Sequence, residues 1–224
     1  SFNLATHVND DINAVHLNRD RLNQFLPSAP LWLNQTHSVD AIKLPSLSFN
    51  ADASYTSEKN TICVVQTADC LPVLVTNNEG TIVASIHAGW RGLHAGVLQA
   101  SASALSQACK VPLTQIKAWM GPAIGPDSFE VGAEVFQAFA EQNASSVDCF
   151  KPCAALTDKP EKYMADLYAL ARLALRELGD ANIEGGGYDT FTDPRWFSHR
   201  RGQQQGVQSG RFATLIRLLP EHGV

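Results

Sequence analysis

The sequence has no apolar run approaching the roughly 20 residues that a helix needs to cross a bilayer, so we expect no membrane partner. It also has no excess of basic residues, since 17 Lys and Arg stand against 22 Asp and Glu and leave a net charge of −5. Such a charge does not recruit nucleic acid or anionic lipid. We find no internal repeat and no low-complexity linker. A chain of 224 residues therefore predicts a single domain spanning 1–224.

The sequence also lacks a regular cysteine framework. Its five cysteines are Cys63, Cys70, Cys109, Cys149 and Cys153. An odd number at irregular spacing is a poor basis for disulfides, so we expect reduced thiols and a cytoplasmic location. The chain begins at Ser1 with neither a methionine nor a signal peptide, and we expect that its N-terminus is trimmed.

Apolar, β-branched segments predict a hairpin near the middle of the chain. Residues 61–67 and 71–76 read as strands, and residues 77–80 form a turn before a strand over 81–87. We expect further strands at 32–36, 115–120 and 211–219, and helices at 18–25, 93–109, 132–142 and 163–178. Strands and helices intermix without strict alternation, which favours an α+β fold with a mixed sheet over a doubly wound one.

Three polar segments follow the ends of these strands, and each carries a side chain able to bind a metal. They contain His37, Cys70 and His87. Cys70 and His87 flank the predicted hairpin, so its two ends can share one pocket. Two histidines and one thiolate leave the fourth tetrahedral position open, as in a catalytic zinc site. Zinc lowers the pKa of a water in that position to about 7.

The residues alone leave other interpretations of these positions open. A cysteine beside a histidine also suits a thiol nucleophile with its base. A single cysteine is often a small core residue, and a histidine at a strand end is often only hydrogen-bonded. Asp69, next to Cys70, either orients a ligand, serves as an acid or base, or is an ordinary turn aspartate.

Two arginine-bearing segments are candidates for anion binding. Gly89–Gly92 precedes the predicted helix and contains Arg91, whose fork of donors suits phosphate or carboxylate. The second segment contains Arg200 and Arg201 beside Phe197 and His199, with Arg211 soon after. An ordinary strand–helix turn and a solvated surface explain these two segments equally well, whereas an anionic or planar ligand is the functional alternative.

Taken in order, the motifs resemble one family along nearly the whole chain. They read SFNLATHVNDD, NRDRL, QTHSVDA, TADCLPVLVT, HAGWRGLHAGV, GPAIGPDSFEVG and FSHRR…SGRFATLI. This pattern resembles the bacterial YfiH/YlmD-like family, catalogued as polyphenol oxidase or laccase-like and as purine nucleoside phosphorylase. The resemblance implies an α+β fold with a mixed β-sandwich-like core and helices packed outside, similar to the catalytic domain of cytotoxic necrotizing factor.

The resemblance also implies a site and an activity. The family's metal triad falls on His37, Cys70 and His87. The implied reactions are phosphorolysis of adenosine, inosine and methylthioadenosine, with adenosine deamination, at a zinc centre in which Cys70, His87 and Asp69 act in catalysis. The small-molecule partners are then a nucleoside and phosphate, and we expect a monomer or homodimer. The candidates for phosphate binding are Arg91, Arg200 and Arg201.

Two other activities are associated with the resemblance. One is copper-dependent oxidation of phenols, and the other is a cysteine hydrolase or amidase reaction in the editing of peptidoglycan precursors. Multicopper oxidation needs many histidines and often methionine, whereas this chain has seven His and two Met. We therefore do not expect true laccase activity. Such a site still binds copper easily, but zinc is the cofactor we expect.

One stretch departs from the family pattern. Members often carry a cysteine shortly before the FSxRR segment, where this chain reads Gly187–Phe191 with Asp189 in the middle. A second metal site that depended on that cysteine would be absent here. Residues missing from the N-terminus would also remove part of a pocket.

Overall fold

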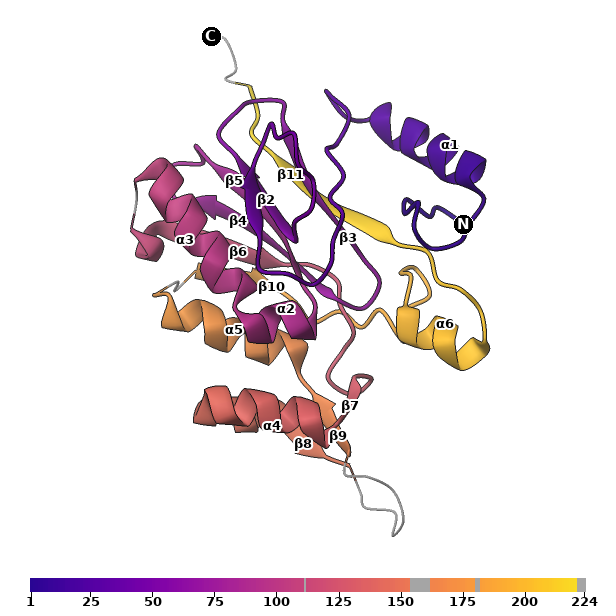
Figure 1. Cartoon of the computed structure of the whole chain (residues 1–224), viewed down its shortest axis with the longest axis vertical. Coiled ribbons are helices and arrows are strands. Elements are labelled where there is room, and N and C mark those ends of the chain that lie inside the picture. The colour runs from indigo at the N-terminus through magenta and orange to yellow at the C-terminus, as the bar shows by residue number, and fades with distance from the viewer. Residues whose placement is uncertain (111, 154–161, 180–181, 221–224) are drawn as a thin grey trace.

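The computed structural model describes residues 1–110, 112–153, 162–179 and 182–220, and its largest element is a six-stranded sheet (Figure 1). The strand order is β1-β2-β5-β4-β6-β10. The strands are β1 (Ala41–Lys43), β2 (Ala53–Thr56), β5 (Val83–Ala88), β4 (Leu71–Asn77), β6 (Ile116–Met120) and β10 (Asn182–Gly185). The outer pairs, β1–β2 and β6–β10, are parallel, and the inner pairs are antiparallel. The predicted mixed sheet is confirmed.

The central hairpin of this sheet brings the start of β4 beside the end of β5. In the β4–β5 pair, Leu71 lies opposite Ala88 and Pro72 opposite His87. The turn is held by Asn77, whose side-chain oxygen accepts the N–H of Thr81 at 2.8 Å. Residue 70 therefore lies beside the His87 end of the hairpin, as the sequence predicts.

Layers cover the two faces of the sheet. On one face lies an antiparallel pair, β3 (Ile62–Thr67) and β11 (Phe212–Arg217), and on the other lie helices α2 (Trp90–Ala95), α3 (Val97–Cys109) and α5 (Leu167–Glu177). Because side chains alternate along a strand, Ala84 and Ile86 of β5 join the helical core, whereas Val83 packs with Cys63 of β3. His87 follows the alternation of Val83 and so projects on the β3 side. This arrangement matches the expected sandwich-like core, while its likeness to cytotoxic necrotizing factor stays a prediction.

Two predicted helices are interrupted in the structure. The helix expected at 93–109 is two helices, because Gly96 adopts φ 94° between α2 and α3, a left-handed conformation that glycine adopts readily. The segment expected to be helical over 163–178 begins as a strand, β9 (Lys162–Ala165). Asp166 then caps α5, because its side chain accepts the N–H of Ala169.

The N-terminal predictions also need correction. No strand forms over 32–36, where the only pairing among the described residues is an isolated bridge between Asn34 and Asn50. The helix expected at 18–25 is α1 (Ile12–Asn23), which begins earlier because Asp11 caps it by accepting the N–H of Asn13. The region before His37 is therefore a loop fastened by side chains rather than a strand.

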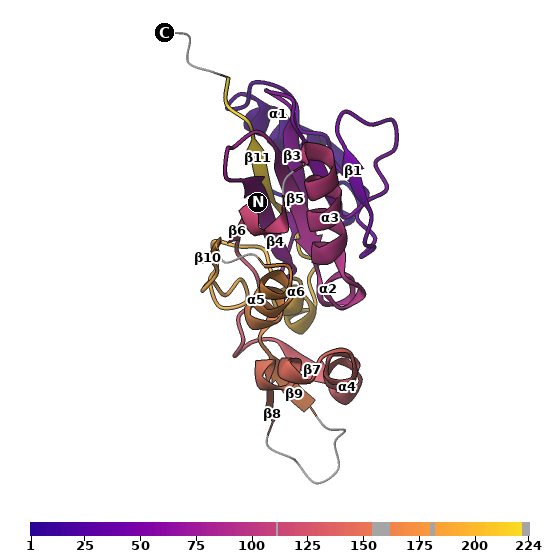
Figure 2. The same ribbon diagram turned by 90° about the vertical axis from the view of Figure 1, so that its left-hand side faces the viewer.

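The remaining elements lie at the two sides of the sandwich. Helix α4 (Ala133–Gln142) and a three-stranded sheet of β7 (Glu130–Gly132), β9 and β8 (Phe150–Pro152) form one end of the molecule in both views (Figures 1 and 2). Within the described ranges, no helix is long and apolar enough to cross a membrane.

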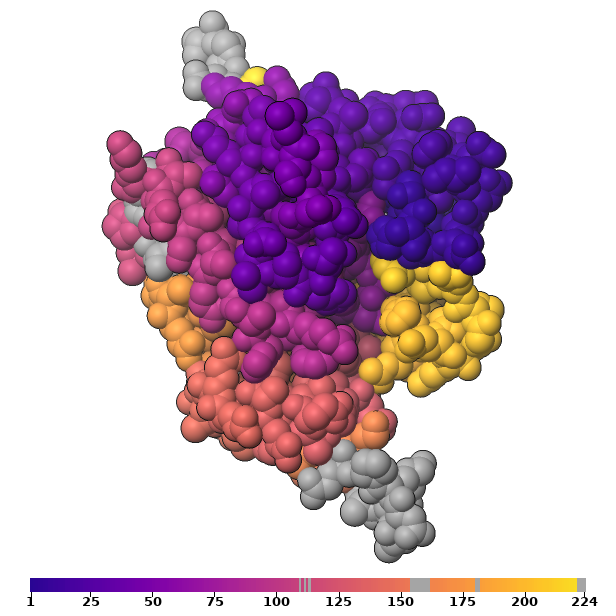
Figure 3. Space-filling model, in the orientation of Figure 1, coloured from indigo at the N-terminus to yellow at the C-terminus, as the bar shows by residue number. Residues whose placement is uncertain are grey.

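The first residues of the chain lie against its last quarter (Figure 3). The backbone N–H of Leu4 donates to the carbonyl of Arg211 at 3.1 Å, and the N–H of Arg211 donates to the side chain of Asn3 at 2.8 Å. Helix α6 (His199–Gln205) lies beside this junction. Segments from both ends of the chain therefore reach the same region of the surface.

Candidate metal centre

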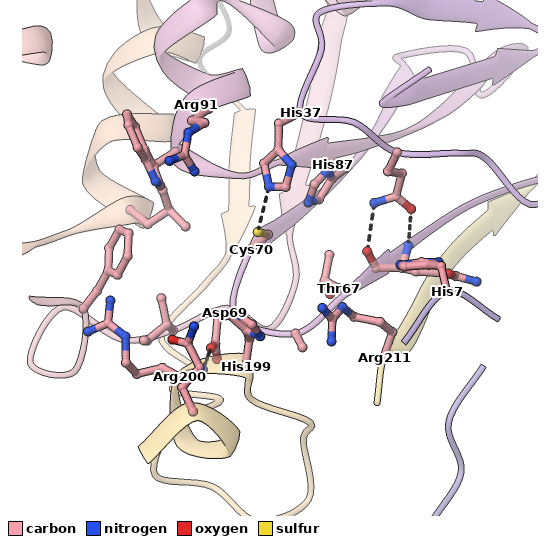
Figure 4. Close-up of a pocket in the computed structure, with 18 residues that line it drawn as sticks. His7, His37, Thr67, Asp69, Cys70, His87, Arg91, His199, Arg200 and Arg211 are labelled. Carbon is pink, nitrogen blue, oxygen red and sulfur yellow. Dashed lines mark hydrogen bonds between the residues drawn. The ribbon is translucent and has the colours of Figure 1, made fainter. Parts of the chain in front are cut away.

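The three side chains that the sequence singles out meet in space (Figure 4). His37 lies on the loop before β1, Cys70 immediately precedes β4, and His87 lies near the end of β5. Nε2 of His37 is 3.7 Å from Sγ of Cys70, and one ligand atom from each of the three residues lies within 4.8 Å of the others. His87 is buried, Cys70 half-buried and His37 exposed, so the group is open to solvent on one side.

A residue that the sequence analysis did not identify holds this group together. Asp52 is fully buried, and its Oδ1 lies 2.7 Å from Nδ1 of His87. The same carboxylate accepts the backbone N–H groups of Thr36, His37 and Ser38 and the hydroxyl of Ser38. Asp52 thus orients the His87 ring and fixes the loop that carries His37. Its hydrogen bond occupies Nδ1 of His87 and leaves Nε2 as the free ligand atom.

The charges of the centre favour a thiolate next to an imidazolium when no metal is bound. Burial raises the pKa of the Cys70 thiol, but the charge of His87 and hydrogen bonds with both histidines outweigh it, so the pKa is lowered. Burial lowers the pKa of His87, but the charge of Cys70 and the hydrogen bond to Asp52 raise it above its ordinary value. A low-pKa thiolate is the form in which cysteine binds metals and acts as a nucleophile.

The donor set and the space around it fit a metal ion. Two imidazole nitrogens and one thiolate suit zinc or copper. A Cβ added at Gly89 would lie 2.6 Å from Cδ2 of His37 and 3.1 Å from Sγ of Cys70. The His37 ring can therefore occupy its place only because residue 89 has no side chain. The structure shows a group that could hold a metal, and the ligand role of each residue stays a prediction.

Asp69 lies beside this group, but its carboxylate is already engaged. Oδ1 accepts the hydroxyl of Thr190 at 2.6 Å, and Oδ2 accepts the backbone N–H of Arg200 at 2.7 Å. Asp69 has φ 84°, so the chain turns sharply just before Cys70. These contacts tie the loop before β4 to the start of α6 and give Asp69 the means to position Cys70.

A cavity of about 340 Å³ opens over the centre, within the size range of small-molecule sites. Apolar side chains line part of it, and these are Ala68, Trp90, Ile124, Phe129 and Leu167. Polar and basic side chains line the rest, among them His7, Gln35, Gln66, Arg91, His199, Arg200 and Arg211. The cavity thus offers an apolar surface, several cationic groups and a thiolate–histidine centre within one space.

The three predicted phosphate-binding arginines are placed differently. Arg91 is exposed, with its guanidinium 4.4 Å from the centroid of the Trp90 ring, and it lines the cavity. Arg200 also lines the cavity and donates to the carbonyl of Glu130 at 2.9 Å.

Arg201 does not line the cavity. Its guanidinium donates to the carbonyls of Thr190 at 2.9 Å and Phe191 at 2.8 Å, and further to those of Asp193 and Trp196. The prediction that Arg201 binds phosphate therefore needs correction, because its donors hold the 190–196 loop instead.

Asp189, in the stretch before the FSHRR segment, has a definite role in the cavity wall. Its carboxylate accepts the backbone N–H of Gly125 at 2.9 Å and the hydroxyl of Ser128 at 2.6 Å. These bonds fasten the loop that carries Phe129, one of the apolar residues of the cavity.

The four free thiols among the described side chains are Cys63, Cys70, Cys149 and Cys153, in agreement with the expectation of reduced cysteines.

Comparison with known proteins identifies the same family over nearly the whole chain. Residues 1–219 match a family model described as multi-copper polyphenol oxidoreductase laccase. The chain is 45% identical to an Escherichia coli protein named purine nucleoside phosphorylase YfiH, covering 98% of this chain and 87% of that protein. A Pseudomonas aeruginosa purine nucleoside phosphorylase is 44% identical over 97% of this chain and 86% of its own length.

Solved structures agree with this comparison. A Neisseria meningitidis protein, NMB0706, superposes with a TM-score of 0.87 at 41% identity, covering 98% of this chain and 87% of that chain. YlmD from Geobacillus stearothermophilus superposes with a TM-score of 0.82 at 26% identity, covering 98% and 86%. The chain therefore belongs to the YfiH/YlmD family, whose model carries the laccase description and whose curated relatives are named purine nucleoside phosphorylases.

Proposed function

We propose that this protein is a purine nucleoside phosphorylase that acts on inosine, adenosine and methylthioadenosine, with zinc held by His37, Cys70 and His87. The observation that carries the proposal is the cavity, in which an apolar aromatic wall and cationic side chains surround the His/Cys/His centre. The names of the curated relatives support the same reaction.

The cavity walls suit the parts of a nucleoside. A purine is flat and aromatic, and the rings of Trp90 and Phe129 offer surfaces for it to pack against. The ribose then lies over the centre near Cys70 and His87. In phosphorolysis a phosphate oxygen forms a bond to C1′ of the ribose while the bond from C1′ to the base nitrogen breaks. The base leaves with the electron pair of that bond and takes up a proton.

Zinc at this centre would supply Lewis acidity toward an oxygen atom of a bound ligand. The part of this chain is to hold the three donor groups in place, through Asp52 and Gly89, and to keep Cys70 ionised. We propose adenosine deamination as a second activity of the same centre. It is measured as inosine formed from adenosine in the absence of phosphate. Asp69 acts in this proposal as a positioning residue, because both of its oxygens are engaged.

The direct test is to incubate the zinc-loaded protein with inosine and phosphate. We expect hypoxanthine and ribose 1-phosphate in equal amounts, and no hypoxanthine when phosphate is omitted. Chromatography with absorbance detection follows the base, and a coupled sugar-phosphate assay follows the second product. Absence of hypoxanthine from the zinc-loaded protein would contradict the proposal, and hypoxanthine formed equally well without phosphate would show a hydrolase instead.

Replacing Gly89 with alanine tests the fit of the metal centre. The added Cβ would lie 2.6 Å from Cδ2 of His37, so the ring has to swing away from Cys70. We expect zinc affinity to fall by about 10- to 100-fold, as when the support of a metal ligand is removed. Competition with a chromogenic chelator measures the affinity. Unchanged zinc affinity in a folded Gly89→Ala protein, checked by circular dichroism, would show that His37 is not a ligand.

A second candidate function has a specific observation in its favour. Asp52, His87 and Cys70 form a chain of contacts like that of a cysteine hydrolase, with His87 as the base and Asp52 as the residue that orients it. The second candidate function is therefore an amidase reaction on peptidoglycan precursors. Unlike the zinc enzyme, such a hydrolase would be unaffected by chelators.

Copper-dependent phenol oxidation has weaker support from the geometry. The family model is described as a multi-copper enzyme, yet the described part of the chain contains one group of three metal-binding side chains. Multicopper chemistry needs several neighbouring copper sites with many histidines. Metal analysis of protein purified without added metal separates zinc from copper. The cytoplasmic location, the monomeric or homodimeric state and the single catalytic domain over 1–224 stay predictions.

A further inference from the structure

Three basic side chains that no comparison assigns line adjoining parts of the cavity wall. His7 comes from the N-terminal segment, His199 from the start of α6, and Arg211 from the residue before β11. We call these three residues the basic cluster. In Figure 4, Arg211 and His7 lie on one side of Cys70, and Arg91 and Arg200 lie on the other. The basic cluster also lines a neighbouring hollow formed with residues 202–209, so it stands at the wall of both spaces.

Arg211 is the central member, and within the described residues its guanidinium makes no direct ion pair with a carboxylate, although the charges of Cys70 and Asp69 act on it from nearby. It is partly buried, and burial lowers the pKa of its guanidinium. Nη1 donates to the carbonyls of Ser209 at 2.9 Å and Gly210 at 3.0 Å, which hold the side chain in place but do not balance its charge. By contrast, exposed Arg195 pairs with Asp193 at 2.6 Å. A guanidinium that is partly withdrawn from water and has no direct ion pair is stabilised further when an anionic ligand binds to it.

The two histidines add hydrogen-bond donors beside Arg211 and remain reachable from solvent. Both are exposed at the rim of the cavity. Burial and then the charge of Arg211 lower the pKa of each ring, which places the guanidinium charge close to both. A neutral imidazole still offers one N–H donor. Arg211, His7 and His199 thus present donors from three separate segments toward one space, as recognition of a tetrahedral oxyanion requires.

The chemistry of phosphorolysis indicates which side of the cavity the phosphate occupies. The attacking oxygen approaches C1′ from the face opposite the departing base. If the base packs against Trp90 and Phe129, the phosphate lies across the His/Cys/His centre from them. Arg91 and Arg200 are on the aromatic side, since one lies over the ring of Trp90 and the other near that of Phe129. His7 and Arg211 are on the far side, and His199 lies between the two sides (Figure 4).

We propose that His7, His199 and Arg211 form the phosphate subsite of this protein, in place of the arginines of the aromatic side. The reaction assigned to this subsite rests on the proposed phosphorylase function, whereas the binding of inorganic phosphate to it does not. Arg211 supplies the charge, and the two imidazoles supply donors that close the subsite from the N-terminal segment and from α6.

The test measures binding of inorganic phosphate to the zinc-loaded full chain by equilibrium dialysis with radiolabelled phosphate. We expect Arg211→Gln to raise the Kd about tenfold or more, the scale of a lost charge-assisted contact. His199→Ala and His7→Ala should each raise it severalfold. Arg217→Gln is the matched control, because Arg217 lies at the far end of β11, the strand that follows Arg211, and pairs there with Ile62. Its Kd should stay within twofold. Arg91→Gln should also stay within twofold.

The outcomes separate this proposal from the phosphorylase proposal. Unchanged phosphate binding in both Arg211→Gln and His199→Ala would overturn the subsite, as would a tenfold loss in Arg91→Gln alone. If Arg211→Gln does not fold, as judged by thermal unfolding, the two exposed histidines carry the test by themselves. Phosphate bound through the basic cluster without any hypoxanthine from inosine would leave the subsite standing and contradict the phosphorylase. Hypoxanthine formed by His199→Ala with an unchanged KM for phosphate would support the phosphorylase and contradict the subsite.

Discussion

Replacement of Cys70 by serine is expected to remove both zinc and activity. Sγ of Cys70 lies 3.7 Å from Nε2 of His37, and its pKa is lowered, so it is the anionic member of the centre. A serine hydroxyl stays protonated and is a poor zinc ligand. We expect zinc content to fall well below one equivalent and hypoxanthine formation to fall at least about 100-fold, as when a group at the reacting centre is lost. Elemental analysis and the inosine assay measure the two effects.

Cys153→Ser is the matched control for this experiment. Cys153 is a free thiol at the edge of the three-stranded sheet, where its backbone N–H donates to Lys162, and it lies outside the cavity lining. Its replacement should leave zinc and activity unchanged. Chelation then distinguishes the two candidate functions. If the parent protein keeps an activity after its zinc is removed and Cys70→Ser abolishes that activity, Cys70 is a nucleophile and the zinc proposal is wrong.

Replacement of Asp52 by asparagine is expected to have the largest effect on stability. The fully buried carboxylate contacts Nδ1 of His87 and accepts three backbone N–H groups and the hydroxyl of Ser38. An asparagine amide would turn its NH₂ toward some of these donors and leave them without an acceptor. Removing one partner from a buried charged pair costs about 3–5 kcal/mol. We expect a loss of that size in the free energy of unfolding, measured by urea denaturation.

The same substitution should also weaken metal binding, because Asp52 orients His87 and the loop of His37. Loss of such a supporting carboxylate typically costs about 10- to 100-fold in metal affinity. Asp40→Asn is the matched control, since Asp40 is exposed and lies near the same loop. Asp52→Asn protein with parental stability and zinc affinity would show that the carboxylate does not organise the centre, and would remove the physical basis for the His87 orientation proposed above.

Much of the fold is predictable because it depends on local patterns. The strands β3, β4 and β5 are apolar and β-branched, and a turn-forming segment separates the last two, so their pairing follows from neighbouring residues. The errors occur where one residue breaks a pattern. Gly96 divides a continuous helical periodicity, and the Asp166 cap starts a helix where apolar spacing alone would start it earlier. Short strands such as β1 and β10 have too few residues to show a pattern.

The candidate site likewise contains residues that the sequence predicts and residues that it does not. Cys70 and His87 lie at the two ends of one hairpin, so their meeting follows from local pairing, and the family resemblance identifies His37. Asp52 could not be predicted, because an isolated buried aspartate has no signature in a sequence until the loops around it are placed. Arg201 shows the opposite error, since a basic pair beside an aromatic residue suggested a ligand, but its donors hold backbone carbonyls.

The sequence by itself determined the mixed α+β architecture, the hairpin and the types of side chain able to bind a metal, because periodicity and donor chemistry are properties of the residues. Only the tertiary structure decided which basic residues face the cavity and which acidic residue supports the centre. His7 is separated from His199 and Arg211 by nearly the whole chain, and it meets them because the N-terminal segment pairs with residue 211. Contacts at such separation depend on the complete packing of the molecule.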